Sequence, residues 1–405
     1  MDMDVHAIVK MASYIGAGLC VAGGAIGAAT GKGYIAGMAN QAISENPSKS
    51  GTIVRNMLVG QAVAESAAIF ALVISVLLVF LRFPADTVLK AAALLGAGLC
   101  MGLGSIGSGL GSGYPAGGSC LAIARKPDLS GRLITNMLIG SAVCQTPAIF
   151  SLVFAMMLLF IDFSHAPVSP TWAALLGAGI CMGAGAIGSG LGSGFPGEEA
   201  CMGIAKQPAV SGRLTTTMLI GSAVCQTPAI FSMVIALMLL FLNFADAPPS
   251  PTWAALLGAG IATGVAAIGS GMGGGMAAGA SCEGIARNPD TFGQVTTVML
   301  VGQAVAQTPS IFGLLMSFIL IFKVFPEAAT LAAPMALLGA GISSGFGGLG
   351  PGLGNGLTAR GAVKWVARNV EETTALMRTM LVGQAVSQST AVYALVVSLV
   401  LIFVV

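Results

Sequence analysis

Charged residues are scarce in this sequence. Only 8% of its 405 residues are charged, whereas 56% are hydrophobic and the mean hydropathy is +0.91. Soluble domains carry about 25% charged residues. A water-soluble domain this apolar would expose too much nonpolar surface, so the composition indicates an all-helical membrane protein.

Basic runs, CxxC motifs and a basic leader are also missing. The net charge is only +2, and we expect no nucleic-acid partner. The eight cysteines lie in apolar stretches, and we interpret them as small packing residues instead of metal ligands or disulfides. We expect no cofactor, no resident metal and no catalytic chemistry of the chain's own. The start, "MDMDVHAIVKMASY", lacks a basic n-region before a cleavage site and is interpreted as a first helix, not a signal peptide.

The sequence does contain one motif that is repeated five times with small changes, called the repeated phrase below. "GQAVAESAAIF" begins at residue 60, and related phrases begin at residues 140, 221, 302 and 383. A second phrase, "GAGLC" or a close variant, begins at residues 16, 96, 177, 258 and 339. The spacing of 80 or 81 residues indicates five copies of one unit. We place these units at residues 1–84, 85–165, 166–246, 247–327 and 328–405.

Each unit holds two apolar segments that can cross a bilayer core of about 30 Å at about 1.5 Å per residue. The first segment is Gly-rich, as in "GAGLCMGLGSIGSGLGSGYPAGG", and the second is bulkier, as in "AIFSLVFAMMLLFIDF". A polar turn such as "ARKPDLSG" separates them. The pattern predicts an all-α membrane protein of five tandem transmembrane hairpins and ten helices. The Gly-rich helices should pack closely as an inner layer, with the second helices facing lipid.

Basic residues indicate the orientation. Residues such as Arg125, Lys126 and Arg213 gather in or beside the turns within hairpins, whereas the links between hairpins carry fewer basic and more acidic residues. We therefore expect the turns to lie in the cytoplasm and both termini outside.

The repeated phrase carries a carboxylate in only one copy. Glu65 in the first copy and Lys32 before it both lie roughly 20–27 Å from the turn, near mid-membrane. A carboxylate there must be protonated, paired or bound to an ion, so two interpretations stay open: an ion or proton site, and a static pair with Lys32. An amide cannot release a proton, so the other four copies should not carry protons. Their equivalent residues are Gln145, Gln226, Gln307 and Gln388, and we expect helix–helix hydrogen bonds from the adjacent Thr146, Thr227, Thr308 and Ser389.

Other acidic residues lie nearer the turns. Glu198, Glu199 and Glu283 precede the turn prolines by ten residues or fewer. We interpret them as packing or snorkelling residues at the cytoplasmic interface. A functional role for the Glu198–Glu199 pair is the alternative.

Together these motifs resemble the c subunit, or proteolipid, of rotary ATP synthases, in particular the F-type. The run "GGAIGAATGKGY" is similar to the family's first helix, the turns "ARKP", "AKQP" and "ARNP" resemble its Arg-Gln-Pro loop, and "GQAVAES" resembles its ion-site phrase. The resemblance extends over essentially the whole chain, five times over. It implies a c-ring of hairpins, part of which this chain forms, rotating in membrane lipid. The implied partners are other c-ring chains, a stator a subunit bearing an Arg, and central-stalk subunits at the cytoplasmic turns.

The resemblance also implies an ion site. In the family, a carboxylate takes up a proton or sodium ion, crosses the lipid face neutralised and releases the ion on the other side. That role falls on Glu65, with Val63 and Ser66 beside it. Sodium-dependent members have a Gln where this chain has Lys32, and some use a hydroxyl where it has Ala67. These departures argue against sodium at Glu65, and a locked Lys32 would also prevent proton carriage.

We therefore expect a rotor component of a rotary ATP synthase or ATPase in the bacterial inner membrane, carrying at most one ion per five hairpins. The alternative is a non-translocating structural arc of a mixed ring that also contains ordinary c subunits, with a static Glu65–Lys32 pair. A secondary transporter would need broken helices and polar groups converging on one substrate, and the sequence shows neither.

Overall fold

The computed structural model describes residues 4–84 and 87–404, and the regular structure in these residues is helical. Ten spans among them are long and apolar enough to cross a membrane, which confirms the predicted all-helical hairpin fold. The first spans of the hairpins are α1 (Val5–Glu45), α3 (Leu89–Arg125), α5 (Val168–Lys206), α7 (Pro249–Arg287) and α10 (Ala332–Val366). The second spans are α2 (Ser50–Phe80), α4 (Ser130–Phe160), α6 (Ser211–Phe241), the pair α8 (Phe292–Ala306) and α9 (Thr308–Phe322), and α11 (Thr373–Val404).

One short 3-10 turn joins the two spans of each hairpin. The five turns are η1 (Pro47–Lys49), η2 (Pro127–Leu129), η3 (Pro208–Val210), η4 (Pro289–Thr291) and η5 (Val370–Glu372). In the second hairpin the preceding residue, Lys126, ends the first helix at φ −138° and ψ 75°, because a residue before proline is driven out of the helical region. The fixed φ of Pro127 then starts the next helical turn, where its missing N–H costs nothing.

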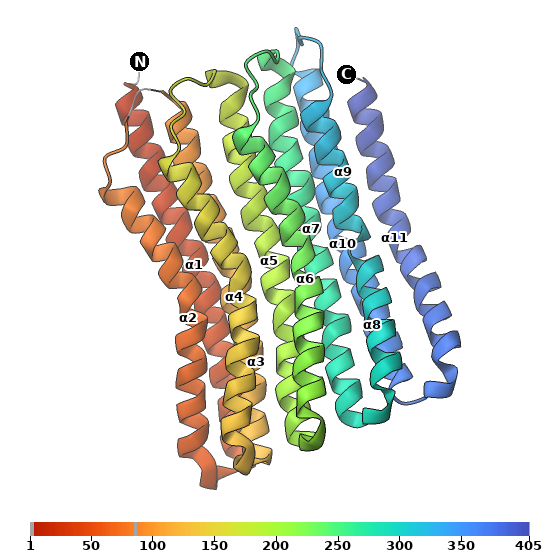
Figure 1. The fold of residues 1–405 in the computed structure, drawn as a ribbon. Helices are drawn as coiled ribbons and strands as arrows, with labels where there is room; N and C mark the ends of the chain where they lie inside the picture. The colour runs from red at the N-terminus through yellow and green to blue at the C-terminus, as the bar shows by residue number, and fades with distance from the viewer. Residues whose placement is uncertain (1–3, 85–86, 405) are drawn as a thin grey trace.

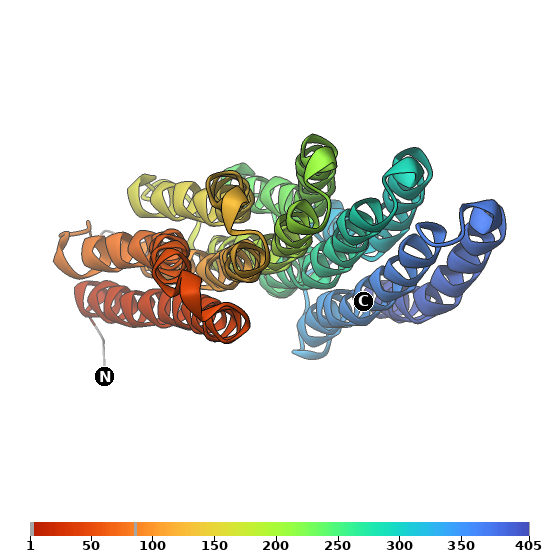
Figure 2. The ribbon, with the colours of Figure 1, turned by 90° about the horizontal axis from the view of Figure 1, so that it is seen from below.

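The spans form two layers. α1, α3, α5, α7 and α10 pack side by side in chain order, and each second span packs against the first span of its own hairpin. Both chain ends lie at one end of the bundle and the turns at the other (Figure 1). Viewed from below, the rows bend into an arc with the first hairpin, in red and orange, at one end and the last hairpin, in blue, at the other (Figure 2).

Glycines bring the inner helices into backbone contact, as the Gly-rich first segments predict. A Cβ on Gly107 would lie 2.3 Å from the carbonyl oxygen of Ile187, and one on Gly190 would lie 2.7 Å from the carbonyl carbon of Gly107. Real Cβ atoms do not approach backbone that closely. Any side chain at these positions would therefore separate α3 from α5.

The fourth outer span is divided into α8 and α9 at Gln307. Pro309 follows the break and has no N–H to donate to the Val305 carbonyl, four residues earlier. By contrast, α4 and α6 continue through Pro147 and Pro228. A proline at the same position of the repeat therefore lies within a continuous helix in the second and third hairpins and next to a helix break in the fourth.

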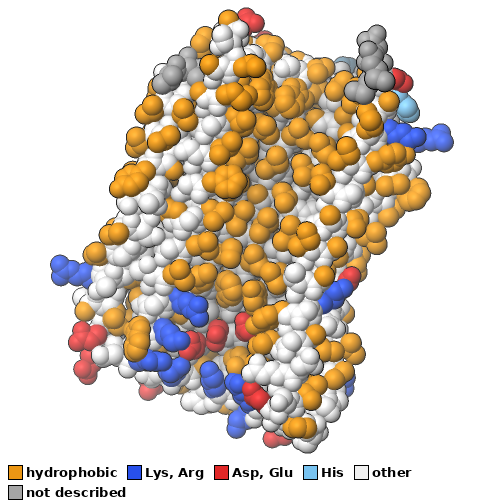
Figure 3. Space-filling view, turned by 180° about the vertical axis from the view of Figure 1, so that it is seen from behind, with side chains coloured by type: hydrophobic (Ala, Val, Ile, Leu, Met, Phe, Trp, Pro, Cys, Tyr) orange, Lys and Arg blue, Asp and Glu red, His pale blue; other side chains and the backbone are white. Residues whose placement is uncertain are grey.

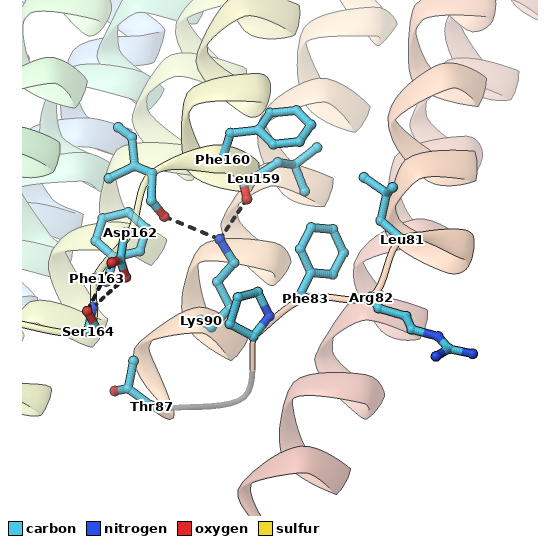
Figure 4. A pocket seen from close by; sticks show the side chains of 12 residues that line it. Leu81, Arg82, Phe83, Thr87, Lys90, Leu159, Phe160, Asp162, Phe163 and Ser164 are labelled. Atoms are coloured by element: carbon cyan, nitrogen blue, oxygen red, sulfur yellow. Dashed lines mark hydrogen bonds between the residues drawn. The ribbon is translucent and has the colours of Figure 1, made fainter.

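A lysine closes the end of α4 at the end of the bundle opposite the turns. The Lys90 ammonium donates to the carbonyl oxygens of Leu159 at 2.6 Å and Ile161 at 3.2 Å (Figure 4). The rings of Phe83 and Phe163 lie 5.5 and 5.9 Å from it. The last carbonyls of a helix lack intrahelical donors, and the helix dipole favours a cation beside them. Lys90, in the first turn of α3, therefore ties the start of α3 to the end of α4, beside a cavity of about 390 Å³.

Gly107→Ala tests the backbone contact between α3 and α5. It should lower the free energy of unfolding by about 1–3 kcal/mol, the usual cost of overpacking, measured by denaturant titration in detergent micelles. Gly131→Ala is the matched control, because a Cβ on Gly131 meets nothing within 4 Å. Equal effects of the two substitutions would contradict the packing argument.

Candidate functional site

The five equivalent positions of the repeated phrase lie in the five outer spans. Glu65 is in α2, and the four glutamines follow in α4, in α6, between α8 and α9, and in α11. The equivalents of Lys32 lie on the paired inner helices. They are Ser112, Ser193, Gly274 and Asn355.

Glu65 and Lys32 form an ion pair in the first hairpin. The two side chains are 40% and 36% exposed, respectively, because α1 and α2 form one end of the arc. Alanines of α1 and α2, with Val21, Ile69 and Leu72, line an open hollow beside the pair. The carboxylate is therefore accessible from the free edge of the chain and is neutralised by its own hairpin.

The predicted companion Val63 is engaged by the next hairpin. Its carbonyl oxygen accepts a hydrogen bond from the Gln145 amide nitrogen at 3.2 Å. Ser66 is partly exposed next to Glu65. The structure thus brings Glu65 together with Lys32 and directs the Val63 carbonyl toward the second hairpin.

Two of the glutamines, Gln226 and Gln307, link neighbouring outer helices through carbonyls that prolines leave without a partner. Pro147 has no N–H for the Val143 carbonyl, and the Gln226 amide nitrogen donates to that oxygen instead, at 3.0 Å. One hairpin further on, Pro228 frees the Val224 carbonyl, which accepts from Gln307 at 2.9 Å. No water is available to such a carbonyl inside a bilayer, so the amide satisfies a group that would otherwise cost free energy.

The same arrangement recurs in the last pair of hairpins with a different donor. The Val305 carbonyl, freed by Pro309, accepts from the Asn355 side chain on α10 at 3.3 Å. We expected helix–helix hydrogen bonds from Thr146, Thr227, Thr308 and Ser389. That expectation is wrong for Ser389, whose hydroxyl donates within its own helix to Val386 at 2.8 Å. The bonds from one outer span to the preceding one come from the amides of Gln145, Gln226 and Gln307.

A second set of hydrogen bonds, which the sequence analysis missed, braces each hairpin at this level. In the first hairpin the Gln61 amide donates to the Lys32 carbonyl at 3.2 Å, and in the second the Ser141 hydroxyl donates to the Ser112 carbonyl at 3.1 Å. Matching bonds occur in the other three hairpins, from Ser222 to Ser193, Gln303 to Gly274 and Gln384 to Asn355. The signal was present in the sequence, because the donor is always the second residue of the repeated phrase.

Comparison with known proteins agrees with this architecture. The family model for the C subunit of ATP synthase matches residues 15–78, 95–158, 176–239, 257–320 and 338–401. The chain belongs to the ATP synthase C-subunit family. Each family match covers both spans of one hairpin, so the family unit occurs five times in tandem.

Relatives include both single-hairpin and longer members. The K subunit of the A-type ATP synthase of Methanocaldococcus jannaschii is 34% identical over 202 residues, which is 50% of this chain and 84% of that protein. The ATP synthase c subunit of Petrotoga mobilis is 52% identical over 67 residues, 16% of this chain and 70% of its own. The ATP synthase c subunit of Thermotoga maritima is 49% identical over 67 residues, which is 16% of this chain and 79% of that protein. The chain is thus a multi-pass rotor proteolipid, of a family whose members form rings within ATP synthase.

The acidic residues near the turns have partners outside the repeated phrase. The Tyr34 hydroxyl of α1 donates to Glu198 of α5. Glu283 of α7 pairs with Arg287 at 2.8 Å and with Lys364 of α10 at 3.2 Å. These contacts hold inner helices to one another near the turns, as the packing interpretation expects.

A double-mutant cycle tests the link between prolines and glutamines. Gln226→Leu should destabilise the protein by about 1–2 kcal/mol, because it leaves the Val143 carbonyl unpaired. In a Pro147→Ala background the helix supplies its own N–H, so the same change should cost clearly less. Free energies of unfolding of the four proteins in detergent give the coupling; additive effects would contradict the proposed link.

Proposed function

We propose that this chain is a segment of an ATP synthase rotor ring that carries one ion on Glu65 for every five hairpins. The observation behind the proposal is the single carboxylate among five equivalent mid-membrane positions. It lies at the free α1–α2 edge with 40% of its side chain exposed. An ionisable group at this depth is by default functional.

The other four hairpins support the ring without carrying ions. Their amides have no proton to release and no net negative charge. Gln145, Gln226 and Gln307 also donate to carbonyls of the preceding outer helix. We infer that these hairpins hold the rotor together mechanically and that ion carriage belongs to the first.

A proton is the proposed cargo, because Lys32 occupies the place where a sodium site would need a neutral ligand. Protonation of Glu65 would release the Lys32 ammonium, and its deprotonation would restore the ion pair. The second candidate function is a non-translocating arc in a mixed ring. A Lys32–Glu65 ion pair that never opens would favour this second function. The two functions differ in whether Glu65 ever becomes protonated.

Sparse charging has a mechanical consequence. Moving one elementary charge across the membrane is worth about 2.3 kcal/mol per 100 mV. A ring built from this chain alone would carry one-fifth of the ions of a ring with a carboxylate in every hairpin. Each rotation would then yield less work, and ATP hydrolysis could drive a steeper gradient, so we propose pumping in preference to synthesis.

The unused glycines at the two ends of the arc support ring closure by another copy. In the second hairpin a Cβ on Gly98 would lie 2.2 Å from the Gly16 carbonyl oxygen. Its equivalent in the first hairpin is Gly18, and a Cβ there, or on Gly33 or Gly350, would meet nothing within 4 Å. We infer that α10 of one copy packs against α1 of the next, which places Glu65 at the junction between chains.

The remaining assembly follows from the family and the charge pattern. We propose that the turns lie in the cytoplasm of a bacterium and contact central-stalk subunits, with both termini outside the inner membrane. A stator a subunit with an Arg would meet Glu65 from the lipid side as the ring turns.

Carbodiimide labelling tests ion carriage, because the reagent modifies protonated carboxyl groups. In native membranes Glu65 should be labelled, and raising the pH should slow the reaction. Lys32→Gln should increase the labelling rate severalfold because it removes the counter-ion of the carboxylate form. Lys49→Gln, at the exposed turn, is the control and should leave the rate unchanged. An unreactive Glu65 in both the native protein and Lys32→Gln would favour the structural arc.

Disulfide cross-linking tests the junction. A Cβ on Gly109 would lie 2.6 Å from the carbonyl carbon of Gly27, and at the two free edges the equivalents of this pair are Ala29 and Gly350. Ala29→Cys with Gly350→Cys should give a ladder of covalent multimers on oxidation. The eight native cysteines are buried, which keeps the background low. Val73→Cys, on the outer face, replaces Gly350→Cys in the control and should give no ladder. If the test pair also gives none, a ring of this chain alone is wrong.

A further inference from the structure

The concave face of the arc carries an apolar stripe on each central inner helix. α5 has α3 and α7 at its sides and α6 behind it, so its remaining partly exposed residues face the concave side. They include Leu176, Ile180, Ile187 and Leu191. Figure 3, the view from behind, shows hydrophobic side chains over the upper and middle parts of this face and charged side chains gathered near its lower end.

Aromatic residues bound this stripe at both ends. Trp172 and Trp253 stack at 5.7 Å at the end away from the turns. Toward the turns, Tyr34, Tyr114 and Phe195 form a row with successive centroids 5.0 Å apart. The 23 residues from Trp172 to Phe195 span about 34 Å of helix, close to the hydrocarbon thickness of about 30 Å. An apolar stripe of this length bounded by aromatic rings has the pattern of a lipid-covered surface.

A pocket of mixed charge lies just beyond the aromatic row, at the end of the apolar stripe. Glu198 and Glu199 of α5 and Arg360 of α10 line a cavity of about 270 Å³. Glu198, Gly279 and Arg360 occupy the same position of three successive repeats, 81 residues apart. The glycine on the middle helix, α7, leaves room between the carboxylates on one side and the guanidinium on the other.

A third carboxylate that lines this pocket, Glu283, already has partners of its own. Glu283, one turn closer to the hairpin turn, is paired with both Arg287 and Lys364. Glu198 accepts from the Tyr34 hydroxyl, which fixes the position of that carboxylate. The pocket therefore presents acceptors for a cation next to a donor for an anion, at the end of an apolar surface.

We propose that this pocket binds the headgroup of a zwitterionic phospholipid that carries a primary ammonium, such as phosphatidylethanolamine. The ammonium donates to the carboxylates of Glu198 and Glu199, Arg360 binds the phosphate, and the acyl chains lie along the apolar stripe. An anionic headgroup would be repelled by the carboxylates, and a trimethylated choline has no N–H to donate. The site lies on α5 and α10, away from Glu65 at the α1–α2 edge, and the inference goes beyond the rotor function without depending on ion carriage.

Lipid retention by the full-length protein tests the proposal. The protein is reconstituted with equal amounts of phosphatidylethanolamine, phosphatidylcholine and phosphatidylglycerol of identical acyl chains, transferred to mild detergent, and its retained lipid is counted by native mass spectrometry. We expect phosphatidylethanolamine to exceed each of the others about tenfold, the ratio given by one additional charge-assisted hydrogen bond. Equal retention of the three lipids, or a preference for phosphatidylglycerol, would overturn the proposal.

Variants locate the site. Glu198→Gln with Glu199→Gln should abolish the preference for ethanolamine over choline, whereas Arg360→Gln should lower the retention of both. Glu371→Gln in the exposed turn η5 is the control and should behave as the native protein. A preference that survives the double substitution would place the lipid elsewhere. If the double variant fails to fold, a competition experiment on the native protein decides. Soluble phosphoethanolamine, which lacks the acyl chains, should not displace the bound lipid. Displacement would contradict the proposal and identify a site for the free headgroup.

Discussion

Inside a membrane, a backbone carbonyl without an intrahelical donor cannot bond to water and must find a donor within the protein. This constraint sets the hydrogen bonds between hairpins in the middle of the spans. Three prolines of the outer spans, Pro147, Pro228 and Pro309, each free the carbonyl four residues before them. Each freed oxygen accepts from an amide side chain of the next hairpin. Each of these prolines therefore creates an acceptor for the next hairpin, whereas the Val63 carbonyl accepts from Gln145 with Ala67, not a proline, four residues after it.

The one carboxylate differs from the four equivalent amides in the bonds it can make. An amide can donate to a neighbouring carbonyl, whereas an ionised carboxylate only accepts. Gln145 and its equivalents in the next two hairpins must donate to the hairpin before them. Glu65 makes no such donor bond and instead accepts from Lys32, which compensates its charge. A charged site at the chain edge and neutral links between hairpins are thus parts of one arrangement.

The two layers divide the remaining tasks. Backbone contact through glycines such as Gly107 and Gly190 keeps the inner helices close together, while the bulkier outer spans carry Glu65 and the four equivalent glutamines. The same closeness lets side chains cross from helix to helix near the turns. Tyr34 of the first hairpin reaches Glu198 of the third, because Gly117, on the helix between them, has no side chain to obstruct it.

The sequence alone determined the five-fold repeat, the hairpin fold, the Gly-rich contact layer and the equivalence of Glu65 with four glutamines, because these follow from spacing and hydropathy, which are local properties of the chain. It also placed Lys32 at the depth of Glu65. Only the tertiary structure showed that Gln226 donates to the carbonyl freed by Pro147, that the fourth outer span divides at Gln307, and that Glu198 and Arg360 line one pocket. Each of these depends on how neighbouring helices are rotated and how closely they approach, and the packing of the whole arc sets both.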